Sequence, residues 1–172
     1  MSTPSTSQNL KEEFNATIKF PAGDFVFKAN KIGIEKSVDS SGSECWVLKA
    51  FQDTYKDPAI KSGLADEIFS IQLTIAGETS ANNQPFQPGT RPPILTKNSG
   101  NLFKIVVIKP DNGKPTDTIE YHIGKSGSTT YLWNKEKTCI TGAFSLLVEN
   151  AQEEPFQLFG SFNLLNRGNH SI

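Results

Sequence analysis

Two segments near the C-terminal end of the chain alternate apolar and polar residues for long enough to constrain the fold. The apolar residues that share a phase are Ile140, Phe144, Leu146 and Val148 in the first segment and Phe156, Leu158, Phe162 and Leu164 in the second. Because successive side chains of a strand point to opposite faces, each segment is predicted to be a strand with one apolar face. The polar residues 149–154 between them predict a hairpin connection.

The same alternation recurs over most of the chain. It predicts further strands over residues 14–20, 25–34, 46–50, 69–75, 102–108, 119–123 and 131–133. Residues 124–128, with two glycines, are predicted to form the turn between the 119–123 strand and its return strand. Nine or ten short strands without an amphipathic helix predict an all-β fold, either a single antiparallel β-sandwich or a calycin-like barrel.

The length of 172 residues predicts a single domain. We expect residues 1–12 to be a disordered leader, residues 13–166 to be the all-β domain and residues 167–172 to be a mobile tail. The leader has neither the charged region nor the apolar region of a signal peptide. No apolar run approaches the roughly 18 residues that a membrane-spanning helix needs, so no transmembrane segment is expected.

Net charge and cysteine content bear on two points, the class of partner and the presence of disulfides. The formal net charge is −1, with basic and acidic residues interspersed. A nucleic-acid partner is therefore disfavoured, because such proteins usually carry a basic stripe that contacts phosphates. The two cysteines, Cys45 and Cys139, are too few for a disulfide framework. They are predicted either to be buried thiols on strands or to form one bridge, which would require an oxidising compartment.

Residues that could support catalysis or bind a metal are sparse. The only histidines are His122 and His170. If Tyr121 and Ile123 point inward, His122 faces outward, and it is then expected to be a solvated side chain. A zinc site needs about four clustered ligands, and a nucleophilic site needs a base beside a serine or cysteine. We therefore predict a non-catalytic protein with no cofactor and no metal site.

Aromatic residues are the remaining functional candidates. Tyr121, Tyr131 and Trp133 are candidates for stacking against a small molecule or a glycan, with core packing as the alternative. Phe86 lies in the proline-rich segment 84–93, and Phe103 and Phe159 are out of phase with their neighbours; all three are candidates for an interaction surface. We expect Phe86 to be more exposed than residues on the core face of a strand.

The order of these segments resembles a known family. The chain closes with Thr141-Gly-Ala-Phe-Ser145 and Gly160-Ser-Phe162 after a tyrosine-containing strand pair. In this it resembles a family of small, uncharacterised all-β proteins that are frequent in the Bacteroidota and often lipid-anchored in the envelope. The resemblance implies an all-β fold, and an extracytoplasmic location if a signal has been removed. It implies no catalytic residue.

Two functions from different classes follow as expectations. The first is a non-catalytic structural or protein-interaction domain whose partner is a second copy or another protein. The second is a small-molecule or glycan binder that uses aromatic residues at a barrel mouth or on a sheet face. A concave pocket of several hundred Å³ lined by tyrosine and tryptophan would favour binding. A filled sandwich with exposed Phe86 or Phe103 would favour interaction.

Overall fold

The computed structural model describes residues 11–52, 66–108 and 116–167, which form ten β-strands. The strands are β1 (Glu13–Phe20), β2 (Gly23–Lys28), β3 (Lys31–Val38), β4 (Glu44–Gln52), β5 (Asp66–Ala76), β6 (Ser80–Pro85), β7 (Ser99–Ile108), β8 (Thr116–Trp133), β9 (Cys139–Glu149) and β10 (Pro155–Leu165). The described residues contain no helix, so the all-β prediction is confirmed.

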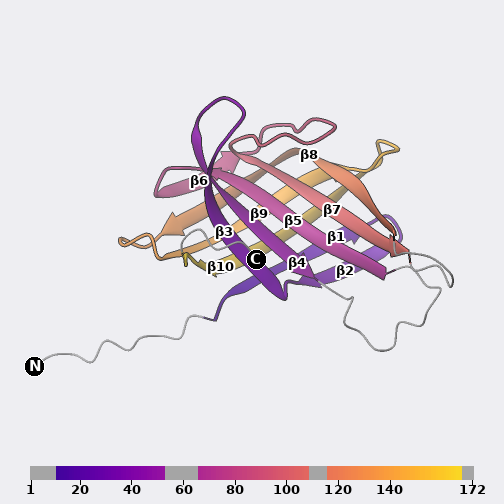
Figure 1. Ribbon diagram of the computed structural model, residues 1–172, viewed down its shortest axis with the longest axis horizontal. Coiled ribbons are helices and arrows are strands. Elements are labelled where there is room, and N and C mark those ends of the chain that lie inside the picture. The colour runs from indigo at the N-terminus through magenta and orange to yellow at the C-terminus, as the bar shows by residue number, and fades with distance from the viewer. Residues whose placement is uncertain (1–10, 53–65, 109–115, 168–172) are drawn as a thin grey trace, which may run out of the picture.

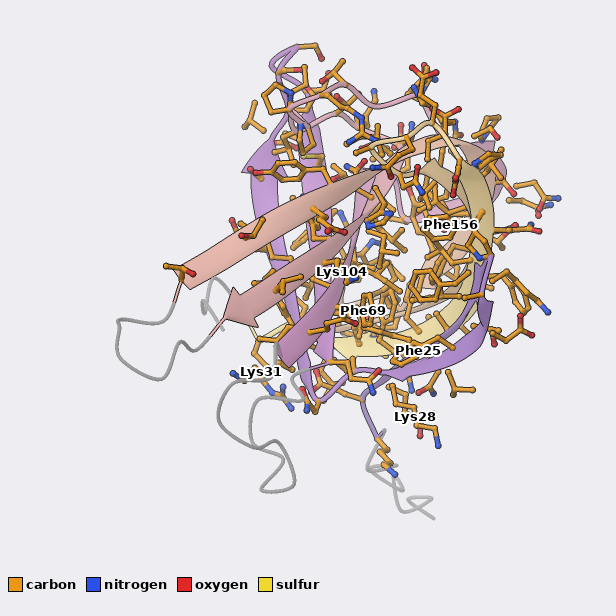
Figure 2. The ribbon with its side chains drawn as sticks, turned by 90° about the vertical axis from the view of Figure 1, so that its right-hand side faces the viewer. Phe25, Lys28, Lys31, Phe69, Lys104 and Phe156 are labelled. Atoms are coloured by element: carbon orange, nitrogen blue, oxygen red, sulfur yellow. The ribbon has the colours of Figure 1, made fainter. Side chains whose placement is uncertain are left out.

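All ten strands belong to one antiparallel sheet that curls into a half-barrel (Figure 1). The strand order is β2-β1-β10-β9-β8-β7-β5-β4-β3, and β6 pairs with the second half of β8, beyond the end of β7. Of the two predicted architectures, the barrel-like one is therefore closer than the sandwich. Figure 2 shows the strands curving around an interior filled with side chains.

The two outermost strands of this sheet, β2 and β3, are consecutive in the sequence. Only Ala29 and Asn30 separate them. The Ala29 N–H donates to the carbonyl of Phe14 in β1, 3.0 Å away, whereas the Asn30 N–H donates to the carbonyl of Phe51 in β4, 2.9 Å away. Ala29 thus continues the hydrogen bonding at the β2 edge of the sheet, and Asn30 begins the hydrogen bonding at the β3 edge. The two ends of the sheet meet at this corner, which fixes the curl.

The strand β8 contradicts the predicted turn over residues 124–128. The chain continues through this segment as a single strand, with a shift of register between Gly124 and Ser126. The glycines serve close packing here: a Cβ on Gly124 would collide with the carbonyl oxygen of Gly100, and one on Gly127 with that of Ser145. Gly127 also has a φ of 131°, which L side chains rarely adopt. The bulge bends β8 so that it can pair with β7 and then with β6.

The inner face of the curled sheet holds the core. Fully buried residues of the core are Phe14, Ile18, Phe27, Leu48, Ile71, Leu73, Leu102, Ile140, Leu146 and Leu158. Those of them in β1, β5, β9 and β10 occupy the alternate positions that the sequence predicts for these strands. At one end of the interior, Phe14 stacks on Phe162, with ring centroids 5.9 Å apart, and lies 5.5 Å from the ring of Phe144.

Residues 86–98, here called the strap, lie between β6 and β7 and cover part of the outer face of the sheet. The Gly89 N–H donates to the Gly124 carbonyl (2.8 Å), and a side chain at Gly89 would have to share space with Ile123 and Asn101. The Arg91 guanidinium donates to the carbonyl oxygens of Tyr121, Glu149 and Asn150, at 2.6–2.8 Å. The strap is therefore bonded to β8 and to the end of β9.

The far end of the strap is held by Asp39, in the β3–β4 hairpin. Its carboxylate accepts hydrogen bonds from the backbone N–H groups of Ser41 and Ser43, from the Ser41 hydroxyl, and from the Lys97 N–H of the strap (3.1 Å). These bonds stabilise the charged form, and they lower the pKa of Asp39 to about 2.

Phe86 is buried, so its predicted place on an interaction surface is wrong. Phe86 is only 5% exposed and belongs to the core cluster. Its backbone N–H donates to the Gly127 carbonyl (3.0 Å), so the first residue of the strap is tied to β8. The neighbouring prolines keep this segment out of the central ladder, as expected. They do not stop the Phe86 side chain from reaching the interior.

The two ends of the described domain are bonded to each other through Glu12. The Glu12 carboxylate accepts from the Leu165 N–H (2.9 Å) and from Arg167 (2.6 Å). The other residues of the predicted leader and tail, 1–10 and 168–172, lie outside the described residues. Cys45 and Cys139 are free and buried, which agrees with the packed-thiol alternative, and burial raises the pKa of both. Within the described part of the chain, no helix is long and apolar enough to span a membrane.

Candidate functional site

One end of the half-barrel is hollow. A pocket of about 640 Å³ opens there between the β1–β2 turn, the β9–β10 turn and the first residues of β5 and β8. Its lining residues are Phe20, Pro21, Ala22, Gly23, Asp24, Phe25, Glu67, Phe69, Lys104, Glu120, His122, Asn150, Ala151, Gln152, Glu154 and Phe156. Small-molecule sites in proteins usually have volumes of roughly 300–1,000 Å³, so this pocket is large enough to hold one.

Four phenylalanines from four strands form the apolar wall of the pocket. Phe69 of β5 is central: its ring centroid lies 5.0 Å from that of Phe25 in β2 and 5.5 Å from that of Phe20 in β1. Phe156 of β10 lies 5.2 Å from Phe20. Phe25, Phe69 and Phe156 are on the inner side of the curled sheet in Figure 2, where Phe25 and Phe69 meet. Phe20 and Phe25 are only partly buried, so their rings offer free apolar surface.

His122 is the buried polar group of this pocket. Its side chain is 9% exposed and its ring packs edge-on against Phe156, with centroids 5.3 Å apart. Neither ring nitrogen has a hydrogen-bond partner, and both are shielded from solvent. The nearest acidic atom, Oε2 of Glu120, lies 3.8 Å from Nε2, which is too far for a hydrogen bond. Burial lowers the pKa of His122 below its usual 6.5, so the ring is neutral at pH 7.

The rim of the pocket is acidic. Four carboxylates, those of Asp24, Glu67, Glu120 and Glu154, line it together with a single lysine, Lys104. Lys104 Nζ lies 3.0 Å from Glu67 Oε1, and Lys19, outside the pocket, lies 2.7 Å from Asp24. Among the residues the structure describes, no lysine or arginine pairs with Glu120 or Glu154. Neither of these two carboxylates forms an ion pair with a described lysine or arginine, and Glu120 lies directly across from Lys104 in the β7–β8 register.

The orientation predicted for His122 is wrong. His122 pairs with Leu102 of β7, and both point to the inner face, whereas Tyr121 and Ile123 point outward. Ile123 is nevertheless buried, because the strap covers the outer face of β8 at this position. Apolar residues therefore occupy the outer face of this strand, and their spacing alone gives the wrong phase.

None of the three residues predicted to stack on a ligand lines the large pocket. Tyr131 and Trp133 are buried in the core, the first with its hydroxyl 3.4 Å from the Ala76 carbonyl and the second against Trp46, with ring centroids 4.9 Å apart. The core alternative thus holds for both. Tyr121 lies on the outer face, edge-on to Phe103 at 5.8 Å.

The three residues predicted to form an interaction surface occupy different places. Phe86 is in the core, as described above. Phe103 is half-buried and, with Tyr121, lines a small outer cavity of about 280 Å³ beneath Pro92 and Pro93 of the strap. Phe159 is 42% exposed on the outer face of β10. The structure brings none of them together.

Polar atoms without partners occur elsewhere, but they do not mark a second site. In the described chain the other two are Asn98 Oδ1 and Trp133 Nε1, and neither residue lines the 640 Å³ pocket. No group of three or more histidine, cysteine or acidic side chains in the same residues is placed to hold a metal ion. Among the described residues, His122 is therefore the one that has buried polar atoms without a hydrogen-bond partner and also lines the 640 Å³ pocket.

Sequence reasoning missed this pocket for a definable reason. Phe20 and Phe25 flank the β1–β2 turn, and the alternation of the sequence does not distinguish them from ordinary core positions. The one available signal was the pair Glu120 and His122, two polar residues two positions apart on a strand, which must share a face. Placing that face inward required the strap, which comes from a distant part of the chain.

No protein-family model, no curated protein and no solved structure matches the chain. The resemblance to envelope proteins of the Bacteroidota therefore stays a prediction. What the protein does has to be inferred from the geometry of the pocket.

Proposed function

We propose that the protein is a non-catalytic binding protein that takes a small, largely apolar molecule into the pocket at the hollow end of the half-barrel. The observation that carries this proposal is the pocket itself, about 640 Å³ in volume and walled by Phe20, Phe25, Phe69 and Phe156. Apolar walls with a few polar groups are typical of ligand sites. The buried, unpartnered His122 is the polar group that would orient a ligand.

Burial of a ligand against these rings supplies the driving force. Each 100 Å² of apolar surface removed from water contributes about 2.5 kcal/mol before the costs of association are subtracted. The rings of Phe25 and Phe69 already contact each other across the open side of the half-barrel, so the wall is preformed. A preformed wall loses little conformational entropy when a ligand binds.

Binding can be tested with N-phenyl-1-naphthylamine, an uncharged dye whose fluorescence rises in apolar sites. We expect a saturable rise with a stoichiometry of one dye per chain. Ala151→Trp, which places a large side chain in the exposed β9–β10 turn that lines the pocket, should weaken dye binding at least about tenfold.

The matched control is Leu132→Trp, which adds the same side chain at an exposed position of β8 outside the pocket. It should bind the dye as the wild type does. Both variants should keep the wild-type melting temperature. Absence of saturable binding in the wild type, or equal binding by the two variants, would exclude the pocket as a binding site.

The interaction-domain function remains a second candidate because of a specific outer-face patch. Val26 and Phe159, 63% and 42% exposed, flank Thr17 in one row across β2, β1 and β10. Exposed apolar neighbours of this kind mark interfaces. If the patch mediates self-association, Phe159→Ser should reduce the fraction of dimer in sedimentation without lowering the melting temperature. A wild-type protein that is monomeric at all concentrations would exclude self-association through the patch.

A further inference from the structure

We infer that the ligand of this pocket carries a protonated primary amine on its apolar body, an inference that rests on the proposed binding function. Three features of the pocket converge on this class. They are the uncompensated carboxylates at the rim, the unpartnered ring of His122, and the aromatic wall.

The described lining of the pocket has more negative than positive side chains. Of its four lining carboxylates, those of Glu120 and Glu154 have no lysine or arginine partner among the described residues, and the one lining lysine already pairs with Glu67. Lys28 and Lys31 lie at the corner between β2 and β3, below the rings in Figure 2, and neither lines the pocket. Among the described residues, the charges that line the pocket therefore favour a cation over an anion. A carboxylate or phosphate ligand would meet like charges there, and the described lining residues offer it no unpaired lysine or arginine.

Glu120 and His122 lie close together without a hydrogen bond between them. The carboxylate Oε2 and the ring Nε2 are 3.8 Å apart and do not bond each other. An N–H donor bonds an acceptor at about 2.9 Å, so an ammonium nitrogen can reach both atoms only after a side-chain movement opens Nε2, which is shielded from solvent. Glu120 is half-exposed and can turn to admit it. A quaternary ammonium group lacks the N–H groups that this arrangement would accept.

The imidazole ring of His122 is neutral at pH 7. Burial lowers the pKa of His122, although the nearby Glu120 opposes the shift, and Lys104 and Arg91 reinforce it. A neutral imidazole has one nitrogen with a lone pair that accepts a hydrogen bond. The ring therefore presents an acceptor to an ammonium donor without adding a repelling charge.

The aromatic wall fits the rest of such a ligand. Phe25, Phe69 and Phe156 bury the apolar body, and an ammonium group near a ring face is attracted by the ring's negative π surface. The charged end then lies at the rim, where Glu120 and Glu154 remain partly in water and need not be fully desolvated. An arylalkylamine combines both parts.

The inference is tested by comparing three probes with the same ring system in calorimetric titrations at pH 7. They are 2-(1-naphthyl)ethylamine, which is cationic, 2-(1-naphthyl)ethanol, which is neutral, and 1-naphthylacetate, which is anionic. We expect the amine to bind at least about tenfold more tightly than the alcohol, and the anion to bind least. The N,N,N-trimethyl derivative of the amine should fall back towards the alcohol, because it cannot donate a hydrogen bond.

Variants identify the groups responsible. Glu120→Gln should reduce the preference for the amine over the alcohol at least about threefold while leaving the affinity for the alcohol unchanged. The matched control is Glu153→Gln, which removes the same charge from the β9–β10 turn at a residue that does not line the pocket. It should leave the preference intact at 0.15 M salt, where distant charges are screened.

The outcomes separate this inference from the proposed function. If the alcohol or the anion binds as tightly as the amine, or if the Glu120→Gln and Glu153→Gln variants behave alike, the amine inference is overturned and the pocket remains a binding site. If none of the probes and no neutral dye binds, the proposed function fails, and the inference fails with it. Selective binding of the amine that depends on Glu120 supports both.

Discussion

The two ends of the half-barrel are both lined with phenylalanine, yet one is filled and the other is hollow. At the filled end, Phe14 is 1% exposed and contacts the rings of Phe27, Phe144 and Phe162. At the hollow end, Phe20 and Phe25 remain partly exposed beside a 640 Å³ pocket. The packing of the phenylalanine rings differs between the two ends because the side chains around them differ.

What separates the two ends is the presence of charged groups on the inner face. At the filled end, the inner position across from Phe144 is the small residue Thr129, which is buried and whose hydroxyl donates to the Ala143 carbonyl. At the hollow end, Lys104, Glu120 and His122 occupy inner positions of β7 and β8. Charged side chains cannot enter an apolar core without a large desolvation cost. They therefore prevent the rings from collapsing into a closed cluster, and the cavity follows.

The same truncation at the two ends should have very different effects on stability. Phe14→Ala should lower the free energy of unfolding by about 3–5 kcal/mol, because it leaves a cavity in a packed core. Phe25→Ala should lower it by only about 1 kcal/mol, because its ring is partly exposed and already faces open space. Urea denaturation of both variants measures the two values. Equal losses would mean that Phe25 is as tightly packed as Phe14 and that the pocket is not open.

The sequence predicts the packed core much better than the hollow end. Strict alternation in β5, β9 and β10 places Ile71, Leu146 and Leu158 in the core, where the structure has them. A strand's own pattern suffices there, because only one of its faces is covered. In β8 the strap covers the outer face over Ile123, so the apolar residues Tyr121 and Ile123 lie on the outer face there and their alternation gives the wrong phase. The pocket depends on that phase, and on rings from four strands that meet only in the folded chain.

His122→Phe should separate stability from binding at the hollow end. It replaces two unpartnered, buried ring nitrogens with apolar edges against Phe156, and should raise the free energy of unfolding by about 1 kcal/mol. The same variant should weaken amine binding. Thermal melts and calorimetric titrations provide the two readouts. A loss of stability would show instead that the ring nitrogens make stabilising bonds in solution.

The smallest expected effects are in the response to pH, which should differ between the pocket and the strap. The lowered pKa of His122 means that the unfolded chain takes up a proton first, so stability should decline as pH falls through about 6.5. The charged groups around the ring are Glu120 of its own strand, Lys104, Arg91, Glu67, Asp24 and Glu154. This decline should be absent from His122→Phe.

Asp39, which holds the strap, responds in a separate range. Its pKa is lowered to about 2 from 3.8, so its stabilising bonds are complete above pH 4 and are lost as pH falls towards 2. Asp39→Asn should therefore be less stable than the wild type at neutral pH, and the difference should shrink below pH 4. Melting temperatures across pH 2–8 measure both responses. A constant difference across that range would contradict the role of the Asp39 charge.

A crystal structure of the protein with 2-(1-naphthyl)ethylamine tests the central claim most directly. The account predicts a naphthyl ring against Phe25, Phe69 and Phe156, with the amine nitrogen within hydrogen-bond distance of both His122 and Glu120. The strands around the pocket should keep their positions. The claim would be contradicted by a saturating concentration of amine that leaves the pocket unoccupied, with the phenylalanine rings closed over the space and His122 bonded to another group of the protein.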